Sequence, residues 1–335
     1  MLAPKTTEAA RCFFYSESVG YVCSSEPLPE TFATPQPPAD TRFGRLTYGR
    51  LADYAYVYPQ PSLSAAPVRN VGAGYLFASV MSRVEASGVA WYQINPGEYV
   101  RDEDLRLVQL PDFQGVEVKA QPQRPFGWVV EDVQPSRQPA AEPDPALTEL
   151  PRLTFIEVFG AVQAGDGWIW YDLGGGRWVR QTYLSLVDVS LRPAGVGPAD
   201  FWAEVDLYEQ TFAAYQGNRL VYATLISSGL NKWPTREGLF QVWSRFVQRK
   251  MSGAQGQVDY YFLEDIPYIM YFDPLKGIGL HGTYWHDRFG YKHSHGCVNM
   301  PILDAEWVFR WSEKAPNDLW VWVHTSDPAA YFTRN

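Results

Sequence analysis

Alternating apolar and polar residues mark a series of short strands in the last third of the chain. Residues 202–208, 211–215 and 220–226 each alternate in this way, with turn-forming residues between them. A period of two is typical of strands that bury one face, so these runs predict two successive β-hairpins. Further strands are predicted by the apolar runs at residues 239–246, 268–272 and 320–324.

One segment of this region has a helical period instead. Residues 303–311 carry apolar side chains at i, i+4 and i+5, which is the spacing of one face of an α-helix. Residues 198–326 are therefore predicted to form a β-sandwich with one short helix. The chain as a whole is predicted to be mainly β.

An internal repeat lies upstream of this domain. Residues 91–101 align without gaps on residues 170–180, and both copies run Trp-Tyr, then glycine, then an aromatic-Val-Arg triplet. The match continues through residues 105–108 and 184–187. An ungapped match of this length indicates a duplicated unit. Each copy predicts a strand, a glycine turn, a second strand and a short return strand.

The repeated pattern resembles the bacterial SH3-like module. This resemblance implies two small barrels, at residues 42–118 and 119–193, with a proline-rich insertion in the second. Residues 1–41 would form an N-terminal segment and linker, and residues 327–335 a C-terminal tail. Modules of this kind often bind cell-wall peptides or glycans. The alternative is that they are spacers packed on the last domain, which is favoured because aromatic residues of small barrels are usually core residues.

The composition supports a mainly β chain and narrows its partners. Aromatic residues make up 16% of the sequence, and Gly and Pro number 27 and 26. The net charge of -9 argues against a nucleic-acid partner, because no basic patch is present to contact phosphates. No run has the length of a membrane-spanning helix, and the first residues lack the apolar core of an export signal.

The three cysteines are unevenly placed. Cys12 and Cys23 lie close together, whereas Cys297 stands alone near the other end. An odd count with one isolated cysteine indicates a reactive thiol. The spacing of Cys12 and Cys23 permits a disulfide but equally permits two free thiols.

The residues around Cys297 have the chemistry of a thiol nucleophile. All five histidines lie in the last domain, and four of them stand close to Cys297. A thiol attacks as its thiolate, so it needs a neighbouring imidazole as base and a third group to orient that imidazole. Residues 294–297, Ser-His-Gly-Cys, supply the thiol, small neighbours and backbone N–H groups for an oxyanion. His281, at the end of an apolar strand, is the candidate base.

The order of these residues resembles the signature of the L,D-transpeptidase catalytic domain, the YkuD family. His281-Gly282 is followed by Ser294-His295-Gly296-Cys297-Val298-Asn299. The similarity extends over residues 206–215, 221–229 and 234–240, and so spans most of residues 201–325. Two features depart from the family pattern. The gap between His281 and Ser294 is short, which implies a compact lid, and Arg236 stands where a proline is usual.

The resemblance implies a role for each residue of the motif. Cys297 would be the nucleophile, His281 its base, and the carbonyl of Gly282 the group that orients the imidazole. The backbone N–H groups of Gly296 and Cys297 would bind the oxyanion. The remaining expected site residues shape the substrate groove or hold the loop: Ser294, His295, Asn299, Trp233, Tyr284, Trp285, His286 and His293.

The implied reaction is a transfer between peptide stems of peptidoglycan. The thiolate would attack the carbonyl of the third stem residue, expel the terminal D-Ala, and pass the acyl group to the side-chain amine of a neighbouring stem. The product is a 3→3 cross-link, and no cofactor is required. Carbapenems are expected to acylate the thiol. The protein is expected to be a monomer that acts in the cell envelope, with an export signal or anchor outside this sequence.

Several alternatives stay open. If water replaces the acceptor amine, the same site is an L,D-carboxypeptidase. If the site is inactive, the protein is a non-catalytic cell-wall-binding protein. A zinc site built from the histidines and Cys297 is a weaker alternative, since no paired cysteines are present. Outside the motif, His324 is expected to be packed or hydrogen-bonded, and Asp206 and Glu209 are expected to be solvated.

Overall fold

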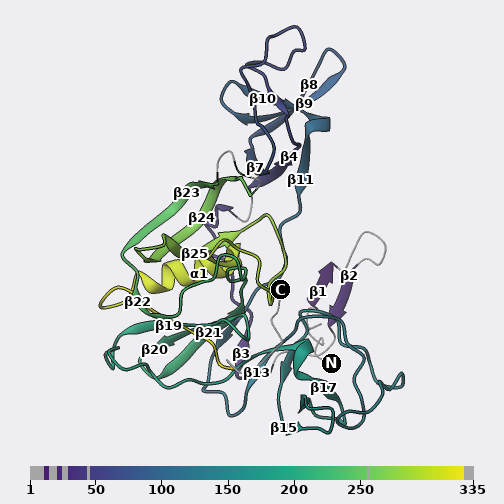
Figure 1. The fold of residues 1–335 in the computed structure, drawn as a ribbon, viewed down its shortest axis with the longest axis vertical. Helices are drawn as coiled ribbons and strands as arrows, with labels where there is room; N and C mark the ends of the chain where they lie inside the picture. Colours follow the sequence, from purple (N-terminus) through teal and green to yellow (C-terminus); the bar gives the residue numbers. More distant parts are fainter. Residues whose placement is uncertain are drawn as a thin grey trace, which may run out of the picture. The chain divides into compact units, whose positions relative to one another are not determined.

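Over the part of the chain that the structure describes, the fold is mainly β with one α-helix, as predicted (Figure 1). The computed structural model describes residues 11–14, 21–24, 29–43, 46–254, 257 and 259–327. These residues divide into two compact units. The first unit contains the described residues up to Pro35, Asp112–Leu225 and those from His324 onward. The second contains the described residues of Gln36–Pro111 and Ile226–Val323.

A five-strand layer is the main sheet of the first unit. Strands β19 (Phe201–Asp206), β20 (Thr211–Gln216) and β21 (Arg219–Leu225) pair antiparallel, which confirms the two predicted hairpins. The layer continues through β12 (Val116–Val118) to β3 (Phe32–Ala33). Residues 112–118 of the first expected module thus lie in the first unit.

The turn between β20 and β21 is fixed by a glycine and a tryptophan. Trp202 is fully buried, stacks on Tyr215 at 4.0 Å between ring centroids, and donates its indole N–H to the carbonyl of Gly217 at 2.6 Å. Gly217 has a φ of +57°. A side chain there would also meet the carbonyl oxygen of Pro198, so this position requires glycine.

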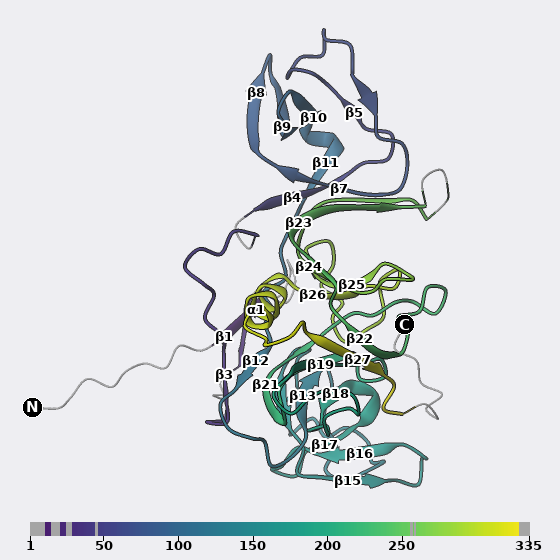
Figure 2. The same ribbon diagram turned by 90° about the vertical axis from the view of Figure 1, so that its left-hand side faces the viewer.

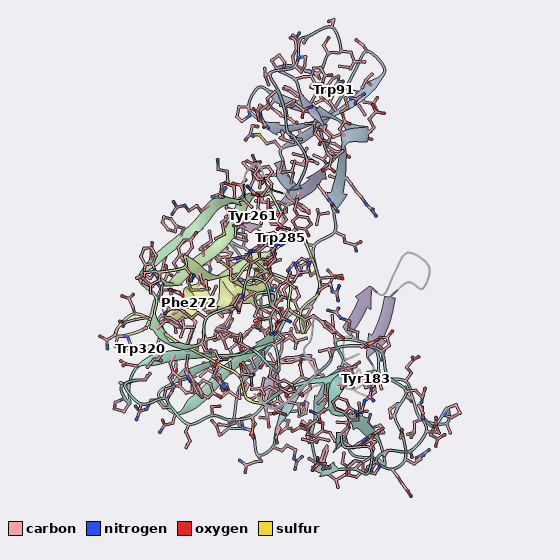
Figure 3. All side chains as sticks on the ribbon, viewed as in Figure 1. Trp91, Tyr183, Tyr261, Phe272, Trp285 and Trp320 are labelled. Carbon is pink, nitrogen blue, oxygen red and sulfur yellow. The ribbon has the colours of Figure 1, made fainter. Side chains whose placement is uncertain are left out.

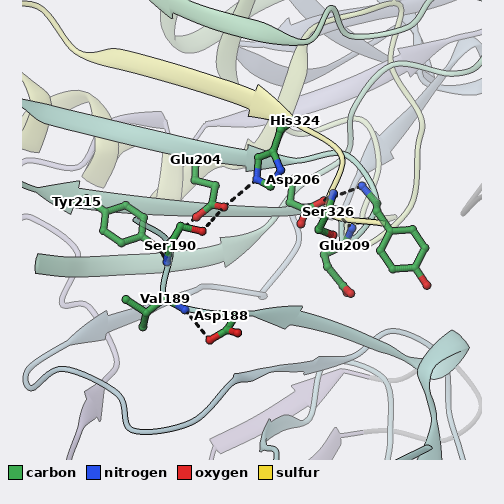
Figure 4. A network of polar contacts seen from close by, with 10 residues as sticks. Asp188, Val189, Ser190, Glu204, Asp206, Glu209, Tyr215, His324 and Ser326 are labelled. Atoms are coloured by element: carbon green, nitrogen blue, oxygen red, sulfur yellow. Dashed lines mark hydrogen bonds and ion pairs between the residues drawn. The ribbon is translucent and has the colours of Figure 1, made fainter. Parts of the chain in front are cut away.

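A buried polar network centred on Glu204 links strand β19 to other segments of the first unit (Figure 4). Glu204 accepts hydrogen bonds from Ser190 Oγ at 2.6 Å and from Tyr215 Oη at 3.1 Å, and its other contact is His324 Nε2 at 2.8 Å. His324 is thus hydrogen-bonded, as expected. A buried carboxylate needs such partners. Through Glu204 the network connects strand β19 to Ser190, which precedes it in the sequence, and to Tyr215 and His324, which follow it.

Asp206 and Glu209 are not solvated, contrary to the prediction. Asp206 is 7% exposed and accepts backbone N–H groups of Tyr208 at 2.8 Å and Ser326 at 3.3 Å (Figure 4). Glu209 is half-buried and accepts the N–H of Leu186 at 2.8 Å. Their positions at a strand end and in a turn suggested solvent exposure. Instead Asp206 accepts backbone N–H groups of its own turn and of Ser326, and Glu209 accepts a backbone N–H group of β18.

The two copies of the sequence repeat have the same order of elements, one in each unit. In the second unit, β9 (Val89–Asn95) and β10 (Glu98–Arg101) lead through a 3-10 turn (Asp102–Asp104) to β11 (Leu105–Val108). In the first unit, β16 (Ile169–Asp172) and β17 (Trp178–Arg180) lead through a 3-10 turn (Gln181–Tyr183) to β18 (Leu184–Val187). The repeat is therefore structural, while its assignment as SH3-like stays a prediction.

The remaining strands complete small sheets around these repeats. In the second unit β8 (Ser82–Ala86) pairs with β9, and β5 (Tyr56–Val57) pairs with β6 (Arg69–Asn70). In the first unit β15 (Gly160–Gln163) pairs with β16, while β13 (Phe126–Val129) lies between β14 (Phe155–Glu157) and β18. Strands β1 (Arg11–Phe14) and β2 (Tyr21–Ser24) pair with Cys12 opposite Cys23 in backbone register. The side chains of both strands are not described, so a disulfide and two free thiols stay equally open for Cys12 and Cys23.

The central sheet of the second unit combines strands from both halves of the sequence. Its order is β11, β4 (Thr47–Leu51), β7 (Tyr75–Val80), β24 (Tyr261–Asp273), β25 (Ile278–Thr283) and β26 (Val298–Pro301). Strand β23 (Ser244–Gly253) also pairs with β24, and β22 (Gly238–Gln241) pairs with β27 (Trp320–His324). The predicted helix is α1 (Ile302–Ser312), which packs against β24, β25 and β26 (Figure 2). Among the described residues, no helix is long and apolar enough to cross a membrane.

Substituting Gly217 by Ala tests the turn that closes β20 and β21. The new Cβ would lie 2.4 Å from the carbonyl oxygen of Pro198 in a left-handed conformation, so we expect a loss of about 2–4 kcal/mol in the free energy of unfolding. Gly167→Ala is the matched control, because Gly167 also has positive φ but has nothing within 4 Å. It should cost about 1 kcal/mol. Equal losses in urea titrations of the two variants would contradict this account.

Candidate active site

The parallel pair β25 and β26 brings the candidate base and nucleophile onto adjacent strands. Leu280 is opposite Val298, and His281 is opposite Asn299. Cys297 is the residue directly before β26. Continuing the same register by one residue puts Cys297 opposite Gly279, which is two residues before His281. The thiol sulfur lies 4.0 Å from the carbonyl oxygen of Gly277, and the backbone of Gly279 also hydrogen-bonds to it. Residues that are 16 apart in sequence thus become neighbours in the sheet.

The orientation of the His281 imidazole is defined by its own strand. His281 is 2% exposed, and its Nδ1 lies 3.1 Å from the carbonyl oxygen of Gly282. A carbonyl oxygen only accepts, so Nδ1 carries the proton and Nε2 keeps its lone pair. Gly282 is required here, since a Cβ would lie 2.8 Å from Cγ of Pro267. The carbonyl takes the place that a carboxylate has in a Ser-His-Asp triad.

Burial keeps both reacting groups neutral at pH 7. Loss of solvation lowers the pKa of His281 to about 4, and the hydrogen bond to Gly282 opposes this only in part. Loss of solvation also raises the pKa of the Cys297 thiol to about 11, while the hydrogen bond from Gly279 opposes it. The thiol is nevertheless only half-buried, so a reactant can reach it. A neutral thiol beside a neutral imidazole favours proton transfer during attack over a preformed ion pair.

A hydrogen-bonded loop holds Cys297. Ser294 Oγ accepts the N–H of Gly296 at 3.0 Å and donates to the carbonyl oxygen of Cys297. Thr235 Oγ1 donates to the carbonyl oxygen of Gly296 at 2.7 Å and accepts the N–H of Gly229 at 2.9 Å. The N–H of Gly296, a predicted oxyanion donor, is thus already used within the loop. Gly296 has a φ of +122°, which a residue with a side chain rarely adopts.

The His295 ring lies against two aromatic rings. Its exposed ring lies 3.9 Å from the Trp233 ring and 5.0 Å from the Tyr261 ring, measured between centroids. Lys232 covers the Trp233 ring at 4.4 Å and forms an ion pair with Asp259 at 2.6 Å. Burial lowers the pKa of His295 below its ordinary value. The two predicted residues His295 and Trp233 therefore do lie together, on an accessible face.

The two lid histidines stack on each other and contact Asn299. The rings of His286 and His293 are 3.9 Å apart at an angle of 29°. His286 Nδ1 accepts the N–H of Arg288 at 3.2 Å, and its Nε2 lies 2.9 Å from Nδ2 of Asn299. Asn299 in turn is opposite His281 in the sheet. The predicted residues His286, His293 and Asn299 thus form one cluster beside the reacting pair.

The two predicted aromatic residues after β25 have different surroundings. Trp285 is labelled in Figure 3, close to the label of Tyr261. Its ring is half-buried, and its centroid lies 5.7 Å from that of the His281 ring. Tyr284 is fully buried, stacks on Tyr48 at 3.7 Å and donates its hydroxyl to the carbonyl oxygen of Glu264. A fully buried ring cannot line a groove, so the structure gives no support to the prediction that Tyr284 contacts substrate. Its alternative assignment as a core residue fits the contacts.

Sequence reasoning missed two tyrosines on β24. Tyr261 and Tyr271 are half-buried, and their pKa values are raised by burial and further by the nearby Cys297 thiol. Tyr271 is opposite Gly279 in the sheet, on the side of β25 away from β26. The predicted strand began only at residue 268, so Tyr261 fell outside it. The continuous aromatic and apolar run of residues 260–263 was the signal that could have included it.

No group of three or more His, Cys, Asp or Glu side chains in the described part of the chain is arranged to hold a metal ion. The His286 and His293 rings stack face to face, so their nitrogen atoms do not converge on one position where a metal ion could bind.

The comparison with known proteins points to the family that the motif resembles. Residues 200–323 match the L,D-transpeptidase catalytic domain, YkuD. YciB of Bacillus subtilis (strain 168), whose name classes it provisionally as an L,D-transpeptidase, is 27% identical over 150 residues, 39% of this chain and 73% of that protein.

Residues 200–323 belong to the YkuD family of L,D-transpeptidase catalytic domains.

Solved structures similar to this chain include L,D-transpeptidases. A mutant of Enterococcus faecium L,D-transpeptidase is 28% identical with a TM-score of 0.33, over 37% of this chain and 50% of that one. LdtMt1 in complex with imipenem is 14% identical with a TM-score of 0.35, over 63% of this chain and 90% of that one. The chain thus spans about half the length of the Enterococcus faecium structure.

Arg236, which departs from the YkuD pattern, has a defined contact in this domain. Its guanidinium forms two hydrogen bonds of 2.7 Å with the buried carboxylate of Asp273, the last residue of β24. This contact holds the pKa of Asp273 below its ordinary value. An ion pair thus anchors the loop of Thr235 to the strand that leads to His281.

The neutral resting state predicts how Cys297 responds to pH. Because burial raises the pKa of the thiol to about 11, its alkylation by iodoacetamide should rise about tenfold per pH unit from pH 7 to pH 10. Peptide mass mapping would follow Cys297 separately from Cys12 and Cys23. A rate that is already at its plateau near pH 7 would show a preformed thiolate and contradict this prediction.

Proposed function

We propose that this protein is a cysteine-dependent L,D-transpeptidase that forms 3→3 cross-links in peptidoglycan through a thioester on Cys297. The observation that carries the proposal is the His281 ring, whose Nδ1 is bound to the carbonyl of Gly282, so that Nε2 keeps its lone pair, on a strand that pairs with the strand directly after Cys297. This is the arrangement that a thiol nucleophile needs. Membership of residues 200–323 in the YkuD family supports the same reaction.

In the first step, Cys297 attacks the carbonyl of the third residue of a tetrapeptide stem. His281 Nε2 accepts the thiol proton as the C–S bond forms. The N–H of Cys297 is the proposed oxyanion donor, because the N–H of Gly296 is bound to Ser294. The C–N bond to D-Ala then breaks, and His281 returns the proton to the leaving amine. The products are free D-Ala and a thioester on Cys297.

In the second step, the side-chain amine of a neighbouring stem attacks the thioester. His281 Nε2 accepts a proton from the amine as the new C–N bond forms. The C–S bond breaks, and the thiolate takes this proton back from His281. The half-buried Trp233 and the exposed His295 are proposed to contact the stems near the thiol. Since the substrate is cell-wall peptide, we place the protein outside the cytoplasm, in the cell envelope.

Two alternatives use the same residues differently. Hydrolysis of the thioester would make the protein an L,D-carboxypeptidase, and products from tetrapeptide stems separate the two: cross-linked dimers for transfer, tripeptides alone for hydrolysis. A wall-binding protein without catalysis is disfavoured by the half-buried thiol beside an oriented imidazole. Survival of all activity in Cys297→Ala would favour that last alternative.

A carbapenem should acylate Cys297. The strained lactam carbonyl takes the place of the stem carbonyl, and the thiol opens it without a leaving group, so the intact mass should rise by one whole imipenem molecule. Cys297→Ala should show no adduct. His281→Gln should form the adduct at least 100-fold more slowly, because general-base catalysis is lost. A wild-type protein that is folded, reduced and still unmodified would contradict the proposed function.

A further inference from the structure

A strand from the N-terminal half of the sequence forms part of the sheet that carries the site. Strand β7 pairs parallel with β24, so that Tyr75 is opposite Tyr261 and Phe77 is opposite Leu263. The N–H of Tyr75 donates to the carbonyl oxygen of Tyr260 at 2.9 Å. Gly74 allows this approach, because a Cβ there would lie 2.6 Å from the same oxygen. The YkuD domain of residues 200–323 therefore shares its sheet with residues outside the family match.

The Tyr75 side chain reaches the segment that follows the catalytic strand. Its hydroxyl donates to the carbonyl oxygen of Trp285 at 3.1 Å. Trp285 is the second residue after β25, and its indole lies 5.7 Å from the His281 ring. The indole is therefore part of the apolar cover that lowers the pKa of His281. A single hydrogen bond thus links Tyr75 of β7 to Trp285, the residue whose indole lies next to His281.

The same strand also supports the other side of the site. Tyr261, opposite Tyr75, has its ring 5.0 Å from the His295 ring and close to the Cys297 thiol. Ser79 on β7 donates to the Asp265 carboxylate of β24 at 2.6 Å. Both flanks of the thiol–imidazole pair thus depend on how β7 sits against β24.

We propose that Tyr75 is a positioning residue of the active site, whose hydroxyl holds the Trp285 backbone so that the indole covers His281. This inference rests on the proposed function for its catalytic consequence. Through Tyr75, the N-terminal half of the chain then contributes to the reaction itself. A spacer or a wall-binding module would make no such contribution. Tyr75 acts through Trp285 and does not touch the reacting atoms.

Tyr75→Phe isolates the hydroxyl. The ring itself is held by Phe77 at 4.8 Å and by the Arg50 guanidinium at 5.4 Å, so it should stay in place. We expect the rate constant of imipenem acylation to fall about 3- to 10-fold, the effect of one lost hydrogen bond. We also expect the pKa of His281 to rise, because a looser indole admits water to the imidazole. The melting temperature should change little.

The measurement is made on the full chain with carbon-13-labelled histidine. The His281 signal is assigned by its loss in His281→Gln, and its titration is compared between wild type and Tyr75→Phe. Tyr54→Phe is the matched control, since Tyr54 is a 65% exposed tyrosine of the same N-terminal region. The control should leave both the acylation rate and the His281 titration unchanged.

Two results would overturn the proposal. An unchanged His281 titration in folded Tyr75→Phe would show that the hydroxyl does not position the cover of the base. A loss of thermal stability with unchanged acylation would show a merely structural role. If wild-type protein fails to react with imipenem, the proposed function fails, while the histidine titration still decides the role of Tyr75.

Discussion

The parallel pairing of β25 with β26 is the constraint on which the rest of the site depends. It places His281 on a strand that pairs with β26, the strand that begins directly after Cys297. Each of the two reactive residues is also held by a hydrogen bond with a residue close to it in the sequence. The carbonyl of Gly282 binds the imidazole, and the Ser294 hydroxyl holds the loop of Cys297. Groups held on rigid strands keep their geometry better than groups on free loops.

Burial is the second physical feature of this site, and it has opposite effects on the two reacting groups. It lowers the pKa of His281 to about 4 and raises that of Cys297 to about 11. A free ion pair is therefore unfavourable, and the thiol rests in its unreactive form. Under the proposed function, the thiol loses its proton to His281 only as the sulfur attacks the substrate carbonyl. The carbonyl then takes up the electron pair that the sulfur donates. This restraint protects a half-buried thiol from oxidation, which attacks thiolates.

Much of the fold could be predicted from sequence, because local patterns determine it. The hairpins of residues 201–225 and the helix came from periodicity, the final strand came from an apolar run, and the repeat predicted matching elements in both copies. The reacting pair came from the motif. Contacts between distant segments could not be predicted. Nothing local shows that β7 joins β24, that Arg236 pairs with Asp273, or that Asp206 is buried.

The central claim is a thioester between Cys297 and a stem that has lost its terminal residue. Purified protein is mixed with a tetrapeptide stem, quenched in acid within seconds, and digested for mass spectrometry. The account predicts that the peptide containing Cys297 carries the stem minus D-Ala, and that Cys297→Ala carries nothing. Release of D-Ala without any adduct on Cys297, or an adduct on another residue, would contradict it.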